Sequence, residues 1–126
     1  MYDVEEGDSG LASSFAASFQ NSKKNGLTVL ITPSHSQPYG ISDAISLMES
    51  FFSDPNVDII SPQLYSSGLE TQNDFTAVGT PWTAYAKSKA KIVPALTYAS
   101  LYEDARQHFQ QDGVSLSGFV IWPKIN

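Results

Sequence analysis

The 126-residue chain contains no cysteine. This absence excludes disulfides and thiolate metal sites, and cysteine usage gives no indication of a cellular compartment. No apolar run approaches the roughly 20 residues that a membrane-spanning helix needs, so we expect no membrane partner. The first residues also lack the basic segment and apolar core of a secretory signal peptide, so none is predicted.

Positive charge is scarce. The chain has 7 Lys and Arg against 13 Asp and Glu, a formal net charge of −6. The basic residues gather only at Lys23-Lys24 and at Lys87, Lys89 and Lys91, which we interpret as solvated positions near helix ends. Because nucleic-acid binding relies on clustered Lys and Arg, we predict no nucleic-acid partner.

Several chemical motifs are missing. No glycine-rich phosphate loop follows a strand-like segment, which argues against a nucleotide-binding sheet. No Gly-x-Ser-x-Gly elbow supports a serine nucleophile, and no His, Asp or Glu cluster has metal-ligand spacing. We therefore predict neither a metal nor a cofactor. His35 and His108 stand among polar residues and are interpreted as solvated.

Strand-like and helical segments alternate along the chain. The predicted strands are 2–5, 27–32, 57–65, 91–97 and 117–122. The first predicted helix runs from Ser9 to Lys24 and ends at Asn25-Gly26, because glycine tolerates the left-handed cap conformation. The second helix should bury five apolar side chains: Ile45, Leu47, Met48, Phe51 and Phe52.

Polar residues at three positions are typical of helix starts. Ser42 is predicted to cap the second helix, and Thr80 the third, where Pro81 takes the first helical position. Ser100 and Glu103 fit a capping box at the start of a helix that reaches about Gln111.

This alternation predicts a single α/β domain over residues 1–126, with five parallel strands joined by helices. Two architectures fit, an open parallel sheet or part of an eight-stranded βα barrel, and the missing phosphate loop favours the barrel. In both architectures functional residues gather where the strands end. Those ends carry Asp3 and Glu5, Pro33 to His35, Gln63 and Tyr65, Thr97 and Tyr98, and Trp122.

Asp3 and Glu5 are two residues apart, so on a strand both point to the same side. Like charges held close raise the pKa of one carboxyl group, which can then stay protonated and donate a proton. The alternative is an acidic chain start that favours the N-terminus of the helix beginning near Ser9.

The strand ends resemble the second half of the family 18 glycoside hydrolases, the chitinase family. The matching segments are Asp3-Val4-Glu5, Leu27 to Pro33, Gln63-Leu64-Tyr65 and Gly118 to Trp122. They are similar, in order, to the ends of the fourth, fifth, sixth and eighth strands of that family's barrel. The resemblance covers essentially the whole chain but only strands four to eight, so it implies a truncated, half TIM-type βα barrel, about half the usual length.

The resemblance also implies roles for individual residues. Glu5 matches the general acid, and Asp3 matches the carboxylate that orients the substrate's N-acetyl group. Tyr65 matches the hydroxyl that hydrogen-bonds the acetamide carbonyl, and Trp122 matches the indole under that sugar. The implied reaction is substrate-assisted, retaining hydrolysis of β-1,4-linked N-acetylhexosamine glycans, in which the acetamide oxygen is the nucleophile.

Two further residues complete the predicted site. Gln63 lies one same-face step before Tyr65 and could line the subsite, and Tyr98 could form part of the rim. A carbohydrate is therefore the expected partner, and the two uncovered sheet edges of a half-barrel suggest a homodimer. Two other functions fit the same residues, a non-catalytic carbohydrate-binding module and a scaffold without a ligand. For each aromatic residue, packing in the core or an interface is the alternative to ligand contact.

Overall fold

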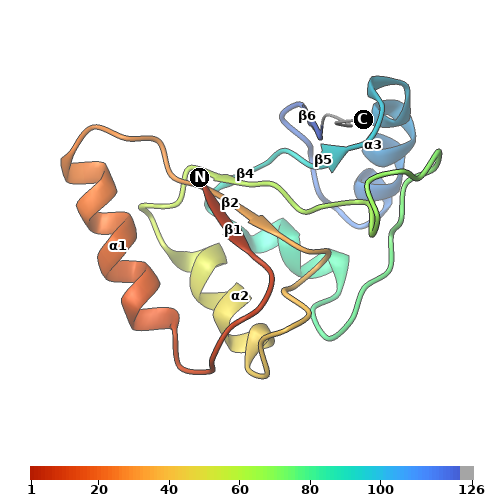
Figure 1. The fold of residues 1–126 in the computed structure, drawn as a ribbon. Helices are drawn as coiled ribbons and strands as arrows, with labels where there is room; N and C mark the ends of the chain where they lie inside the picture. The colour runs from red at the N-terminus through yellow and green to blue at the C-terminus, as the bar shows by residue number, and fades with distance from the viewer. Residues whose placement is uncertain (123–126) are drawn as a thin grey trace.

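The computed structural model describes residues 1–122 and has the α/β architecture that the alternation predicts (Figure 1). Four strands form one parallel sheet in chain order: β1 (Tyr2–Val4), β2 (Leu30–Pro33), β3 (Ile59–Ile60) and β4 (Lys91–Ile92). A second, two-stranded parallel sheet consists of β5 (Ala95–Leu96) and β6 (Val120–Ile121). The helices are α1 (Ala12–Lys24), α2 (Ala44–Ser53) and α3 (Tyr102–Gln111), with two 3₁₀ helices, η1 (Trp82–Lys87) and η2 (Ala99–Leu101).

The α/β class and the parallel pairing are confirmed, but the prediction of five uninterrupted strands was wrong for two of them. The predicted strand 57–65 is regular only at Ile59–Ile60, and the predicted strand 91–97 divides into β4 and β5. Pro62 and Pro94 lie at these interruptions and have no backbone N–H to donate to a ladder. Single parallel bridges, Gln63 to Ala95 and Ile92 to Leu116, still join neighbouring segments across the breaks.

The predicted start of α1 at Ser9 was wrong, because regular helix begins at Ala12. Its predicted end is confirmed. The helix stops at Lys24, and Gly26 follows with φ of +74°, a left-handed conformation that glycine adopts without steric cost.

None of the three predicted helix caps forms. Asp43, not Ser42, precedes α2, and its carboxylate accepts a hydrogen bond from the Gly10 amide instead of capping the helix. Thr80 donates its hydroxyl to the Gln37 side chain, 2.8 Å away, and the helix that follows is a 3₁₀ helix. At Thr80, a tertiary contact therefore takes the side chain that local pattern assigned to the helix end.

The capping box is wrong for a related reason. Ser100 lies inside η2, one residue before Leu101, the residue from which a side chain could cap α3. Glu103 forms an ion pair with Arg106 at 2.6 Å instead of reaching back to a backbone amide.

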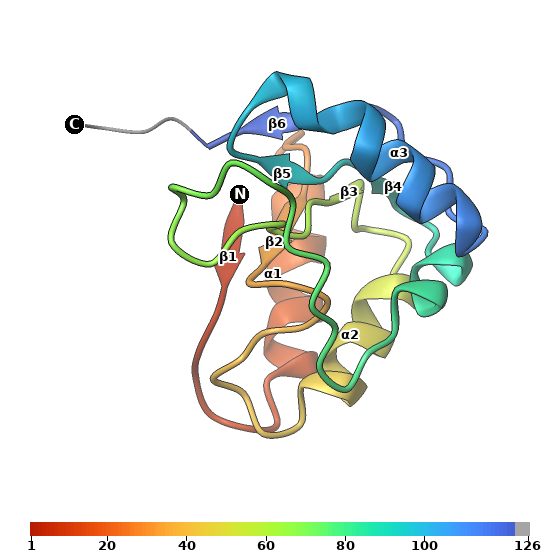
Figure 2. The same ribbon diagram turned by 90° about the vertical axis from the view of Figure 1, so that its right-hand side faces the viewer.

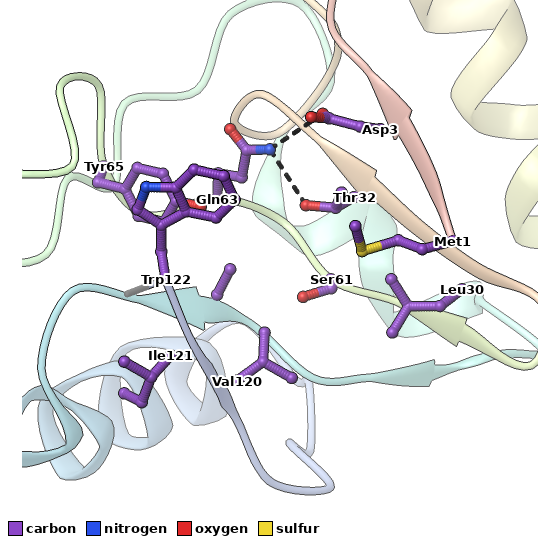
Figure 3. Close-up of a pocket in the computed structure, with 11 residues that line it drawn as sticks. Met1, Asp3, Leu30, Thr32, Ser61, Gln63, Tyr65, Val120, Ile121 and Trp122 are labelled. Atoms are coloured by element: carbon purple, nitrogen blue, oxygen red, sulfur yellow. Dashed lines mark hydrogen bonds between the residues drawn. The ribbon is translucent and has the colours of Figure 1, made fainter. Parts of the chain in front are cut away.

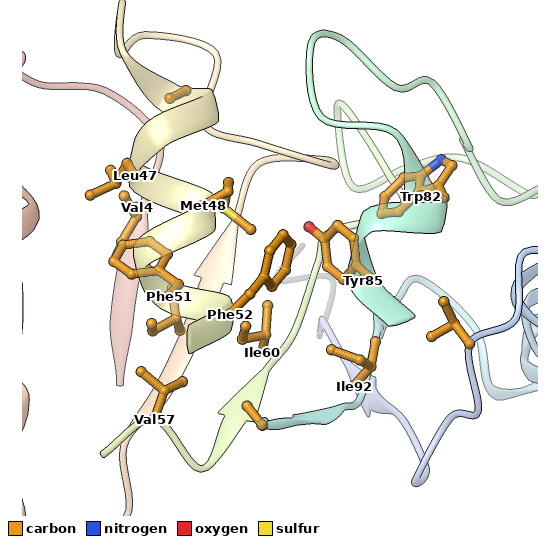
Figure 4. Close-up of a cluster of buried hydrophobic side chains, with 14 of the residues drawn as sticks. Val4, Leu47, Met48, Phe51, Phe52, Val57, Ile60, Trp82, Tyr85 and Ile92 are labelled. Atoms are coloured by element: carbon orange, nitrogen blue, oxygen red, sulfur yellow. The ribbon is translucent and has the colours of Figure 1, made fainter. Parts of the chain in front are cut away.

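A single hydrophobic core joins the strands to the helices (Figure 4). Four of the five predicted side chains of α2 are buried, and they pack with Ile60, Ile92 and Tyr85. Ile45 is 54% exposed, contrary to prediction. The buried positions 44, 47, 48, 51 and 52 follow one helical face, and Ile45 lies at the edge of this face, in the first turn of α2.

The helices lie to one side of the sheet, as the two perpendicular views show (Figures 1 and 2). Because side chains alternate along a strand, Val4, Ile31 and Ile60 face the helix side and are buried in the core. Asp3 and Thr32, which are paired in register, therefore face the opposite side. That second face carries the candidate site.

Phe51 tests this account of the core. It is 1% exposed and makes edge-to-face contacts with Phe15 and Phe19 of α1. Phe51→Ala should lower the free energy of unfolding by about 3–5 kcal/mol, because it leaves a cavity between α1, α2 and the sheet. Ile45→Ala on the exposed face of the same helix should change it by less than about 0.5 kcal/mol. Urea denaturation measures both, and equal effects would contradict the assigned buried face.

Candidate functional site

A pocket of about 270 Å³ opens on the face of the sheets away from the helices (Figure 3). Side chains from both sheets and from the segment after β3 form its walls. The lining residues are Met1, Asp3, Leu30, Thr32, Ser61, Gln63, Tyr65, Ala95, Val120, Ile121 and Trp122. Most of the lining surface is apolar, and the polar groups gather where the strands end. This combination is typical of a ligand pocket.

Gln63 connects the polar groups of the pocket. Its side-chain amide donates to Asp3 Oδ1 at 3.3 Å and to Thr32 Oγ1 at 3.2 Å (Figure 3). Gln63 is only 7% exposed, so these two bonds satisfy both amide hydrogens of a buried group. The amide thereby orients the Asp3 carboxylate on the pocket side of β1.

Glu5 follows Asp3 on the same side of the chain, because the intervening Val4 is buried in the core. Burial of the Glu5 carboxyl group, followed by the nearby Asp3 charge, raises its pKa, and the nearby Gln63 side chain partly opposes this. The residue as a whole remains exposed. The pKa of Glu5 is therefore shifted in the direction that the sequence predicted for one carboxyl group of the pair.

Tyr65 and Trp122 form the aromatic wall. Their ring centroids lie 6.2 Å apart with planes inclined at 29°. Burial, together with the charges of Asp3, Glu5 and Glu70, raises the pKa of Tyr65 to about 12, so its hydroxyl keeps its proton. Trp122 is 49% exposed and offers a ring to which the apolar face of a sugar can stack.

The loop after Tyr65 is held by one carboxylate. Glu70 accepts hydrogen bonds from the backbone amides of Ser66, Ser67 and Gly68, at 3.0, 2.6 and 3.0 Å. Burial alone would raise the pKa of Glu70, but these amide hydrogen bonds outweigh it and lower the pKa to about 2.

This loop also supports Trp122. Gly68 has φ of +83°, and a Cβ atom there would lie 3.2 Å from Trp122 Cδ1. Thr97 anchors the loop to the end of β5, because its hydroxyl donates to the Glu70 carbonyl at 2.7 Å. Any larger residue at position 68 would therefore press on the indole.

The predicted site residues do not all meet. Asp3, Gln63, Tyr65 and Trp122 line one pocket, and Glu5 lies beside it. Tyr98 precedes η2, is 41% exposed and is not part of the pocket lining that the structure describes. Tyr98 follows β5 in the chain, but this position does not place it among the residues that line the pocket.

Both histidine interpretations were wrong. His35 is 1% exposed, and its ring nitrogens contact Asp74 and Tyr39. His108 is partly buried and stacks on Phe75 with ring centroids 3.8 Å apart. His35 lies two residues after the end of β2, at the sheet edge where functional residues of parallel sheets gather. This position after a strand is the feature of the sequence that could have marked His35 as a candidate functional residue.

Within residues 1–122 no group of three or more His, Asp or Glu side chains is arranged to hold a metal ion. No helix in the same part of the chain is long and apolar enough to cross a membrane.

Glu70→Gln tests the role of the loop carboxylate. Because the folded pKa is lowered from 4.5 to about 2, the ionised group stabilises the fold above pH 4.5, and this stabilisation is lost as pH falls toward 2. The variant should be about 1 kcal/mol less stable than the parent protein at pH 7, after allowance for solvent screening. Thermal unfolding between pH 7 and pH 2 should show the difference shrinking, and a pH-independent difference would contradict the assignment.

Similarity to known proteins does not identify the chain. No family model, curated protein or solved structure matches it. The functional interpretation therefore depends on the residues that meet at the strand ends.

Proposed function

We propose that this chain is a chitinase-like, carbohydrate-active domain that binds and hydrolyses β-1,4-linked N-acetylhexosamine glycans. The observation that carries the proposal is the convergence of Asp3, Gln63, Tyr65 and Trp122 on one pocket. These residues come from three separate parts of the chain, and the resemblance to family 18 glycoside hydrolases assigns a substrate contact to Asp3, Tyr65 and Trp122. Chance packing of strands would not be expected to bring together the residues that one mechanism requires.

The half-barrel architecture is part of the same proposal. The two sheets are joined by the parallel bridges Gln63 to Ala95 and Ile92 to Leu116, which extend the strand order from β1 to β6. Helices lie on the outer side, and the pocket lies on the inner side, as in a segment of a βα barrel. The strands would then correspond to the fourth to eighth of the family's barrel.

The chemistry follows the substrate-assisted route. Glu5 protonates the glycosidic oxygen while the acetamide oxygen of the sugar attacks the anomeric carbon from the other side. Asp3, held by Gln63, orients the acetamide N–H, and the protonated Tyr65 hydroxyl donates to the acetamide carbonyl. Water then opens the cyclic intermediate with retention, and Glu5 takes back the proton.

A second function, sugar binding without turnover, is favoured by one observation. Asp3 and Glu5 are both exposed, so water reaches the carboxyl groups on which the acid step depends. A general acid works best in a dry surrounding that keeps its pKa high. The aromatic wall of Tyr65 and Trp122 can bind a sugar without being shielded from water.

Two substitutions separate these functions. Glu5→Gln should reduce hydrolysis of a fluorogenic chitobioside by about 10²–10⁴-fold while leaving chitin binding intact, because it removes only the proton donor. Trp122→Ala should abolish chitin binding and hydrolysis together. Asp8→Asn, which removes an exposed carboxylate three residues after Glu5, is the matched control and should retain the parent rate.

Three outcomes are distinguished by the same assays. Loss of hydrolysis in Glu5→Gln alone supports the enzyme. Chitin binding without turnover in the parent protein, lost in Trp122→Ala, supports the binding module. Neither binding nor turnover in the parent protein overturns both functions and leaves a scaffold without a ligand.

We also propose that two copies associate through the open sheet edges. Val120 and Ile121 of the edge strand β6 are 38% and 42% exposed, and such an edge favours pairing with another chain. Sedimentation velocity at micromolar concentration should show a dimer that dissociates on dilution. A strict monomer in the parent protein would contradict the association.

A further inference from the structure

His35 lies at the centre of a hydrogen-bonded chain outside the pocket. Its Nε2 is 3.1 Å from Asp74 Oδ2, and its Nδ1 is hydrogen-bonded to the Tyr39 hydroxyl. The histidine is 1% exposed, whereas Tyr39 is 55% exposed. A buried imidazole thus connects a carboxylate on one side with a surface hydroxyl on the other.

The direction of these hydrogen bonds follows from Asp74. Its Oδ1 accepts from the Thr76 hydroxyl and amide at 2.6 and 2.9 Å, and its Oδ2 accepts from the Ser66 hydroxyl at 3.1 Å. These donors, with the Thr76 hydroxyl foremost, hold the pKa of Asp74 well below its usual range. The group is an ionised carboxylate, which can only accept hydrogen bonds.

The carboxylate fixes the tautomer of His35. Nε2 must carry the hydrogen that it donates to Asp74, so in the neutral ring Nδ1 is an acceptor. The Tyr39 hydroxyl then donates its only hydrogen inward to Nδ1. Toward solvent, the Tyr39 oxygen presents lone pairs and no hydrogen.

Backbone contacts place Tyr39 beside the candidate site. Gly40 donates its amide to the Glu5 carbonyl at 2.8 Å, and Glu6 and Gly40 form a parallel bridge. By this register Tyr39 occupies the position next to Glu5. Residues at equivalent positions of parallel neighbours point to the same face.

The loop that carries Tyr39 is held at several points. The Tyr39 amide donates to Ser34 Oγ at 3.1 Å, and the buried Tyr85 hydroxyl donates to the Ser36 carbonyl at 2.8 Å. Gln37 accepts from the amide and hydroxyl of Thr80. Such a loop presents Tyr39 in one orientation before a ligand arrives.

We propose that Tyr39 is a substrate-contacting residue of a second sugar subsite beside Glu5, where it accepts a hydrogen bond from a sugar acetamide N–H. His35 and Asp74 are positioning residues that keep the Tyr39 hydrogen turned inward. The exposed phenol ring supplies a face on which the sugar packs. This inference rests on the proposed carbohydrate function and extends it along the sheet edge.

Asp74→Asn tests the relay without changing the size of the side chain. Thr76 still requires an acceptor, so the amide NH₂ of the variant faces His35 and donates to Nε2. The ring must then carry its hydrogen on Nδ1 and donate to Tyr39, which turns the hydroxyl hydrogen outward. A comparable carboxylate-to-amide change selects the wrong histidine tautomer in serine proteases.

The experiment combines two readouts. Nitrogen-15 spectra of the imidazole rings at pH 7.5 should show the Nε2–H tautomer for His35 in the parent protein and the Nδ1–H tautomer in Asp74→Asn. Titration calorimetry with N-acetylchitotetraose, carried out in a Glu5→Gln background so that the sugar is not hydrolysed, should show about three- to tenfold weaker binding for both Asp74→Asn and Tyr39→Phe, because one hydrogen bond is lost. Binding of the monosaccharide N-acetylglucosamine, which has one ring and can fill only the pocket, should be unchanged.

Matched controls keep the outcomes separate. Asp112→Asn, which alters a carboxylate 3.7 Å from the other histidine, His108, should leave both affinities unchanged. If chitotetraose binding depends on Trp122 but not on Tyr39 or Asp74, the second subsite is overturned while the proposed function stands. If the parent protein binds neither sugar, both are overturned. An Nδ1–H tautomer in the parent protein would overturn the relay directly.

Discussion

The packing of α2 against the central strands is the interaction on which the rest of the structure depends. Leu47, Met48, Phe51 and Phe52 press on Ile31, Ile60 and their neighbours, and nearly all of this surface is removed from water. Strands as short as β3 and β4, with two residues each, have too few ladder hydrogen bonds to be stable alone. Burial on the helix side holds them in register, and that register decides which residues face the pocket.

The site is a consequence of this alternation. Successive side chains on a strand point to opposite faces of the sheet. Because Val4 is buried in the core, its neighbours Asp3 and Glu5 lie on the other face. The polar groups there are then arranged by side-chain hydrogen bonds. Gln63 orients Asp3, Glu70 holds the loop against Trp122, and Asp74 holds the histidine between two loops. Carboxylates that accept several hydrogen bonds thus order segments that have no regular secondary structure.

The local sequence pattern predicted the presence of the helices and strands more accurately than the residues at which they begin and end. The apolar stripe Phe15, Phe19 and the glycine at position 26 were sufficient for α1, since both signals are local. The cap at Thr80 failed because a distant partner, Gln37, competes for the same side chain. Ser42 and Ser100 are not caps because Asp43 and Leu101 are the residues that precede α2 and α3. Proline also shortened two strands, since Pro62 and Pro94 leave ladder positions without a donor. The burial of His35 could not be foreseen, because its partner Asp74 is 39 residues away in the sequence.

The sequence by itself determined the α/β class, the parallel pairing and the side of the strand ends on which Asp3, Gln63, Tyr65 and Trp122 lie. Period-two and helical patterns depend only on neighbouring residues, so they need no knowledge of the fold. Only the tertiary structure decided that these four side chains share one pocket, that Tyr98 lies outside it, and that Tyr39, His35 and Asp74 are connected. Those relations join residues far apart in the chain, and they exist only after the core has brought the strand ends together.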